Sequence, residues 1–274
     1  MILDVTTAWN LVLVGFGVGV LVGLTGVGGG AIMTPLLIVL FRLPPSIAIG
    51  TDLVNAALMK AVGAYQHWRQ GTVKLPIVRA LALGSLPAAV LGVGLVKVLK
   101  DLMGSVGENV LTLILAWTLV LVAGMMMYRV WSSWYKSRTP VLTVSTAATR
   151  DSRQAPRHRG LITAILGFVA GTLVSLTSVG AGSIIMVVLV SLYSASAKRL
   201  VGTDIVHAAL LASVAAAGHM WAGNVDLSVA SALLIGSVPG VLVGSRLSVR
   251  MPDKLLRVML ALTLMVTGVR LIVG

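Results

Sequence analysis

Leu24-Thr25-Gly26-Val27-Gly28-Gly29-Gly30 is the stretch that decides the fold, because it returns 152 residues later as Leu176-Thr177-Ser178-Val179-Gly180-Ala181-Gly182. The same shift, without gaps, brings Gly50-Thr51-Asp52 onto Gly202-Thr203-Asp204 and His67 onto His219. About 30 of the 77 pairs between 16–92 and 168–244 are identical, far above chance even for an apolar composition. The chain therefore contains two copies of one unit.

The composition places both copies in a membrane. Hydrophobic residues make up 57% of the 274 residues and charged residues only 11%, and the mean hydropathy is +1.01. A soluble fold of this size needs far more charge on its surface. The net charge of +13 does not indicate nucleic acid, because the basic residues lie between apolar runs, as the positive-inside rule expects. With no cysteine, thiolate chemistry and cysteine metal sites are excluded.

Ten apolar segments, five per copy, predict an all-α polytopic membrane protein with 8–10 membrane segments. They cover 8–25, 31–42, 46–68, 76–97, 108–130, 161–177, 183–194, 199–221, 228–248 and 254–272. The second of each set, 31–42 and 183–194, is too short to cross alone, since 12 helical residues rise about 18 Å. Whether these two segments are re-entrant or span fully is left open. Because the glycine clusters directly precede them, we expect a helix, an unwound glycine turn and a short helix in each copy.

The charge distribution predicts the topology. We expect a first transmembrane repeat over 8–130, a basic cytoplasmic linker over 131–160 and a second transmembrane repeat over 161–272. With the linker inside, 16 basic residues face the cytoplasm and four face outward, which puts the N-terminus outside. Because five segments per repeat is an odd number, the two repeats are predicted to be inverted. A multi-pass protein of the cell inner membrane is expected.

The duplicated glycine turns are candidate anion sites, because the amides at the N-terminus of a half-helix carry partial positive charge. The alternative is plain small-residue helix packing. Lys60 is a lone cation within a span, and its counterpart in the second repeat is Ala212. The predicted substrate-binding residues are Thr25, Gly28, Gly29, Gly30, Lys60, Thr177, Gly180 and Gly182.

Acids and histidines inside apolar segments are rare and costly, so they are functional candidates by default. As alternatives, Thr and Asp of the Gly-Thr-Asp motifs are ordinary helix caps, and the histidines near the interfaces make packing hydrogen bonds. The candidates for proton coupling are Asp52, Asn55, Asp204, His207, His67 and His219.

Enzyme signatures are absent from the sequence. It contains no HExxH, no GxSxG and no paired carboxylates, and the four histidines have no ligand spacing. We expect no enzymatic activity, no cofactor and no metal site.

The motifs resemble those of a known family. Gly23 to Gly30, then Pro35-Leu36-Leu37, then Gly50-Thr51-Asp52 to Asn55 are similar to the sulfite exporter TauE/SafE family, also described as a toluene-sulfonate uptake permease group. The second repeat carries a degraded copy, in which Pro35 becomes Val187, Gly26 becomes Ser178 and Asn55 becomes His207. The resemblance covers nearly the whole chain and implies a bacterial inner-membrane carrier of sulfite, sulfonates or other small sulfur-containing or organic anions.

Together these features predict a secondary transporter that moves such anions across the membrane, in the direction of export and coupled to the proton-motive force. An uncoupled anion channel or facilitator and a divalent metal cation permease are the alternatives. The expected partners are the small anionic substrate and membrane lipid, with a homodimer left open and nucleic acid excluded.

Overall fold

The structure, a computed structural model, describes residues 4–25, 29–136, 159–180, 182–193, 195–248 and 253–273. These residues form helices joined by short turns, without a strand among them. The helices are α1 (Val5–Thr25), α2 (Gly30–Phe41), α3 (Pro45–Arg69), α4 (Leu75–Met103), α5 (Ser105–Lys136), α6 (Arg159–Thr177), α7 (Gly182–Leu192), α8 (Ala197–Trp221), α9 (Leu227–Ser248) and α10 (Asp253–Val273). The all-α prediction is confirmed.

Each predicted apolar segment corresponds to one helix, and most ends agree within three residues. The largest difference concerns α4 and α5, which are longer than the segments 76–97 and 108–130. The two helices are separated only by Gly104, whose φ of +50° suits glycine. Within the extension of α4, Lys97 pairs with Asp101 at 3.4 Å one turn along the helix. Of the predicted linker 131–160, residues 137–158 lie outside the described residues.

Seven of the described helices are long and apolar enough to cross a membrane: α1, α3, α4, α5, α6, α8 and α9. Large apolar side chains in the middle of these helices face outward, such as Leu83 and Ile235, which are 75% and 66% exposed. Water would disfavour a surface of this kind, whereas lipid tails solvate it. The multi-pass membrane prediction is therefore confirmed.

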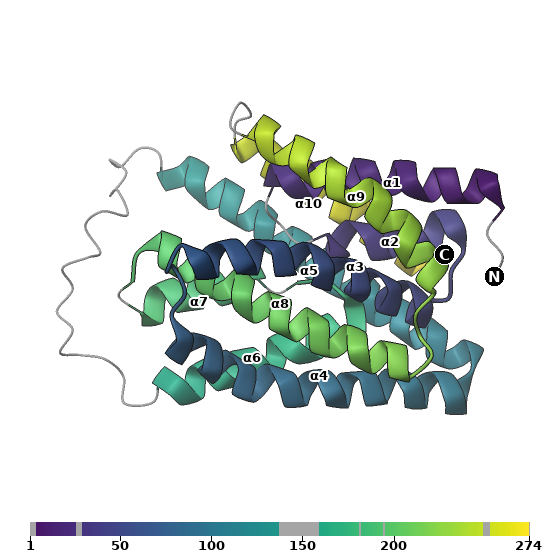
Figure 1. Cartoon of the computed structure of the whole chain (residues 1–274), viewed down its shortest axis with the longest axis horizontal. Helices are drawn as coiled ribbons and strands as arrows, with labels where there is room; N and C mark the ends of the chain where they lie inside the picture. The colour runs from purple at the N-terminus through teal and green to yellow at the C-terminus, as the bar shows by residue number, and fades with distance from the viewer. Residues whose placement is uncertain are drawn as a thin grey trace.

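The two repeats interlock through their helix pairs. Helix α1 packs along α9, and its counterpart α6 packs along α4, whereas α3 pairs with α8 and α5 with α10. Each of these pairs takes one helix from each repeat. In Figure 1, α1 and α9 run together along one side of the bundle and α4 and α6 along the other. How the repeats are oriented across a membrane stays a prediction.

Glycines make the closest of these contacts. A Cβ added at Gly19 of α1 would lie 2.4 Å from the Ser237 carbonyl oxygen of α9. The equivalent contact recurs on the other side, where a Cβ at Gly171 of α6 would lie 2.3 Å from the Ser85 carbonyl oxygen of α4. No real Cβ tolerates such distances, so both crossings depend on small residues, as membrane helix pairs often do.

Candidate functional site

The Gly-Thr-Asp motifs hold α3 and α8 together. A Cβ at Gly50 would lie 2.0 Å from the Asn224 carbonyl oxygen, so α3 touches the backbone that follows α8. The Thr51 hydroxyl next to it accepts a hydrogen bond from the Asp226 amide at 3.0 Å. These contacts join the beginning of α3 to the end of α8, so the two helices run antiparallel.

The second copy repeats both contacts. A Cβ at Gly202 would lie 2.5 Å from the Thr72 hydroxyl oxygen, just after α3, and the Thr203 hydroxyl accepts from the Lys74 amide at 2.9 Å. The alternative that Thr and Asp cap these helices is wrong. The N-cap positions of α3 and α8 are Pro44 and Ser196, and neither makes a side-chain cap.

The third residue of the first motif, Asp52, joins three elements. Its carboxylate is fully buried in α3. One oxygen, Oδ2, accepts from the Thr34 hydroxyl of α2 at 2.7 Å and from the Ser178 hydroxyl of the second glycine turn at 2.8 Å. The other oxygen, Oδ1, is buried without a partner among the described residues.

Asp204 occupies the equivalent place in α8 but has different surroundings. Its Oδ1 is buried without a hydrogen-bond partner in the described part of the chain. A Cβ added at Gly182, the first residue of α7, would lie 3.1 Å from its Oδ2. The two positions that correspond to the hydroxyl donors of Asp52 are Met186 and Gly26, which have no hydroxyl.

Lys60 lies near both acids. Its ammonium interacts electrostatically with Asp204 and, more weakly, with Asp52, and a Cβ added at Gly180 would lie 3.9 Å from its Nζ. Within the described ranges no residue forms a hydrogen bond or an ion pair with it. With both aspartates ionised, the three charges sum to −1, and one added proton brings the sum to zero.

Asn55 and His207, the matched polar pair, each bind a serine of the opposite repeat. The side-chain oxygen Oδ1 of Asn55 accepts from the Ser237 hydroxyl at 2.9 Å, and His207 Nε2 lies 2.8 Å from the Ser85 hydroxyl. His207 Nδ1 is buried without a described partner. Both serines stand in a repeated Gly-Ser-x-Pro motif, at positions 84–87 and 236–239. This repetition was the sequence signal for them, but they were not assigned to the site from the sequence.

The remaining two histidines make packing contacts. His219 is fully buried, and its Nε2 lies 2.9 Å from the Ser175 carbonyl oxygen of α6. His67 Nδ1 lies 2.9 Å from the Thr72 hydroxyl at the end of α3. Both contacts follow the packing alternative, and neither histidine is brought beside Lys60 by a described contact. Their role in proton coupling stays a prediction.

The glycine turns of the two repeats touch each other. A Cβ added at Gly30 would lie 2.0 Å from the Ser178 carbonyl oxygen, and Gly29 is the N-cap of α2, without a side-chain cap. The Thr177 hydroxyl donates to the Leu173 carbonyl at 2.6 Å and accepts from the Val179 amide at 3.2 Å. The hydroxyl proton of Thr177 is thus already donated to Leu173. The predicted hydrogen bond from Thr177 to a substrate anion would require that bond to break. The side chain of Thr25 and all of Gly28 lie outside the described residues.

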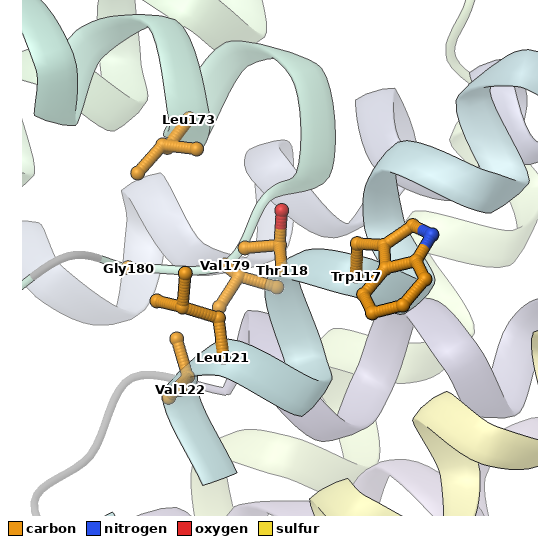
Figure 2. Close-up of a pocket in the computed structure, with 7 residues that line it drawn as sticks. All are labelled: Trp117, Thr118, Leu121, Val122, Leu173, Val179 and Gly180. Atoms are coloured by element: carbon orange, nitrogen blue, oxygen red, sulfur yellow. The ribbon is translucent and has the colours of Figure 1, made fainter. Parts of the chain in front are cut away.

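A small apolar groove runs beside the second turn (Figure 2). Its volume is about 170 Å³, and its walls come from α5, α6 and the turn: Trp117, Thr118, Leu121, Val122, Leu173, Val179 and Gly180. Gly180 lies beside both this groove and the Lys60 ammonium. The described residues contain no group of three His, Cys, Asp or Glu side chains that could hold a metal ion.

Comparisons with known proteins place this chain in a family. The family model described as sulfite exporter TauE/SafE matches residues 11–271. The probable membrane transporter protein YjnA of Bacillus subtilis (strain 168) is 39% identical over 263 residues, which cover 96% of this chain and 99% of that protein. The probable membrane transporter proteins YdhB and YunE of the same strain are 28% and 24% identical, over 96% of this chain and over 99% and 96% of their own. No solved structure matches the chain. The chain belongs to the sulfite exporter TauE/SafE family of multi-pass membrane transporters.

Proposed function

We propose that the protein is a secondary transporter that exports small anions across the bacterial inner membrane, with a proton as the coupling ion. Sulfite, sulfonates and related sulfur-containing or organic acids are the proposed substrates. The family name supports a sulfur oxyanion, and the apolar groove beside Gly180 offers space for the hydrocarbon part of an organic acid. The substrate would be held between the glycine turns, against Lys60.

Lys60 is the observation that carries this proposal. An ammonium group inside a membrane is costly unless it faces an opposite charge. The two acids near it, Asp52 and Asp204, overcompensate it when both are ionised, and the resulting charge of −1 repels an anion. One proton on this cluster removes the excess negative charge. Anion binding and proton binding therefore favour each other, which is the linkage that proton-coupled transport of an anion requires.

The same charge count is compatible with export. A doubly charged anion that leaves together with one proton still carries one negative charge outward. The inside-negative membrane potential drives that movement, by about 2.3 kcal/mol per charge at 100 mV, while a pH gradient that is acid outside opposes the outward step of the proton. A singly charged anion with one proton would move without net charge, so its own outward gradient would have to drive its export against that pH gradient.

The first experiment is a binding screen on the purified protein. A ligand that binds the folded state raises the melting temperature by mass action. The panel contains sulfite, sulfate, thiosulfate, taurine, sulfoacetate, small carboxylates and divalent metal ions. We expect an upward shift with a sulfur oxyanion or a sulfonate. A shift with divalent metal ions alone would overturn the proposal and favour a metal permease.

Flux in proteoliposomes then separates a carrier from a channel. We expect saturable flux, counterflow of labelled anion against unlabelled anion, and a response to an imposed pH gradient. Flux that neither saturates nor shows counterflow would identify an uncoupled channel. Asp204→Asn and Asp204→Ala are expected to remove the response to the pH gradient, and an unchanged response in both would exclude this acid from coupling.

A further inference from the structure

We propose that Asp52 is a positioning residue that clamps the second glycine turn to helix α2, and that this clamp must open during each transport cycle. The two described hydrogen bonds of Asp52 link three separate segments of the chain. Asp52 belongs to α3, Thr34 to the short helix of its own repeat and Ser178 to the turn of the other repeat. A single carboxylate oxygen thus fastens together the two breaks that are expected to enclose the substrate.

The backbone around Ser178 points to the same role. Ser178 adopts a φ of +57°, a left-handed conformation that favours glycine. Glycine does occupy the equivalent place in the first repeat, at position 26. A serine in this strained backbone conformation is maintained when its contacts with neighbouring residues hold it there, as often happens at functional sites. Here its hydroxyl donates to Asp52, and its carbonyl oxygen lies against Gly30.

Among the described residues, only Asp52 makes a clamp of this kind. The positions that correspond to its two donors are 186 and 26, where the sequence has methionine and glycine. The two acids of the duplicated motif therefore have different contacts even though their helices are equivalent. Asp52 is held by two hydroxyl groups, whereas Asp204 faces Lys60 and the start of α7. This assignment rests on the proposed function only where anion affinity or flux is the readout.

The chemistry of the clamp gives a discriminating substitution. Both hydroxyls donate to Oδ2, and Oδ1 has no described donor. The side-chain carbonyl of asparagine has two lone pairs and can accept both bonds, while its amide group takes the place of Oδ1. Asp52→Asn should therefore preserve the clamp. A proton carrier, in contrast, loses its function on the same substitution, because an amide does not titrate.

The first test compares four variants by anion affinity and by flux in proteoliposomes. We expect Asp52→Asn to remain within about threefold of the unsubstituted protein. Asp52→Ala and the double variant Thr34→Val with Ser178→Gly should each weaken apparent affinity about tenfold or more, since hydrogen bonds to a charged group are lost. Ser213→Ala is the control, because among the described residues that hydroxyl bonds only the Ala209 carbonyl of its own helix. Full loss of flux in Asp52→Asn, with an unaffected double variant, would make Asp52 a proton carrier and overturn the clamp.

The second test locks the clamp covalently. The chain has no cysteine, and the Thr34 and Ser178 hydroxyls both lie within 2.8 Å of one oxygen. In the Thr34→Cys, Ser178→Cys variant, oxidation should form a disulfide that replaces the clamp, keeps anion binding and stops flux, and reduction should restore flux to the level of the Thr34→Val, Ser178→Gly variant. Undiminished flux in the fully oxidised variant would show that the clamp need not open. The yield of the cross-link and the melting temperatures of the variants need no substrate. If the unsubstituted protein moves no anion at all, the proposed function fails, while these two measurements still test the contact.

Discussion

At the scale of the residue, Lys60 is the most consequential single position. We expect Lys60→Gln to weaken anion binding about 10- to 100-fold, because a hydrogen bond to a charged group is worth about 1.5–3 kcal/mol. The measurement is the rise of melting temperature with anion concentration. Lys97→Gln is the matched control, because Lys97 is 43% exposed and pairs with Asp101 on the surface. Equal stabilisation of both variants by the anion would remove Lys60 from the site.

Ser85 offers a test of the matched serine contacts. In Ser85→Ala, both ring nitrogens of His207 would be buried without a described partner, which should lower the free energy of unfolding by about 1–3 kcal/mol. In the control Ser231→Ala, an exposed hydroxyl loses its bond to the Ser228 carbonyl, and a change of less than about 0.5 kcal/mol is expected. Denaturant titration in detergent measures both. Indistinguishable stabilities would mean that His207 does not depend on this serine.

The sequence identified the acids and the lone lysine because charges stand out in an apolar chain. It did not identify Thr34 and Ser178 as the partners of Asp52, and the reason is physical. A repeated feature is visible by comparing the two copies, whereas the positions equivalent to these two hydroxyls are occupied by Met186 and Gly26 in the other copy. Their bonds also join residues up to 126 positions apart, so they depend on which helices pack together.

At the scale of the element, two glycines of α1 test whether its glycines are needed for close packing against α9. A Cβ at Gly19 would collide with the α9 backbone, so Gly19→Ala should destabilise the protein by about 1–3 kcal/mol. A Cβ at Gly17 of the same helix would meet nothing within 4 Å, and Gly17→Ala should be neutral or stabilise by up to about 1 kcal/mol. Unfolding of both variants in detergent provides the comparison. If Gly19→Ala is the more stable of the two, the close α1–α9 crossing is refuted.

The helices themselves were predictable, because an apolar run between basic or glycine-rich segments has few alternatives in a membrane. Their partners were not. The spacing Gly15, Gly19 and Gly23 indicates a close helix crossing, but it does not say which helix crosses there. The structure assigns that crossing to α9 of the other repeat. The short helices α2 and α7 were predicted from the short apolar segments 31–42 and 183–194. The contact between the two glycine turns could not be predicted, because it depends on how the two repeats pack together.

At the scale of the whole molecule, contacts at the two ends of the bundle constrain the topology. At one end, the Glu108 carboxylate accepts from the Ser46 amide at 2.9 Å, and Lys100 donates to Asn224 at 2.8 Å. At the other end, the Lys74 amide meets Thr203. Segments that share an end must share a side of the membrane. The segments around Ser46, Lys100 to Glu108 and Asn224, all predicted outside, therefore lie on one side of the membrane. The segment 69–79 and the start of α8, both predicted inside, lie together at the opposite end.

The inversion of the repeats can be tested at equivalent positions. Gln70 follows α3 and Ala222 follows α8 at the matching place, and the antiparallel contact of the two helices puts them at opposite ends. Since the chain has no cysteine, Gln70→Cys and Ala222→Cys each introduce a single thiol. In intact cells, we expect a membrane-impermeant maleimide to label Ala222→Cys and to leave Gln70→Cys unlabelled until the cells are opened. The controls are Ser105→Cys, expected outside, and Ser145→Cys in the predicted cytoplasmic linker. Labelling of Gln70→Cys and Ala222→Cys from the same side would refute the inversion, and with it a carrier that works by exchanging the roles of two inverted halves.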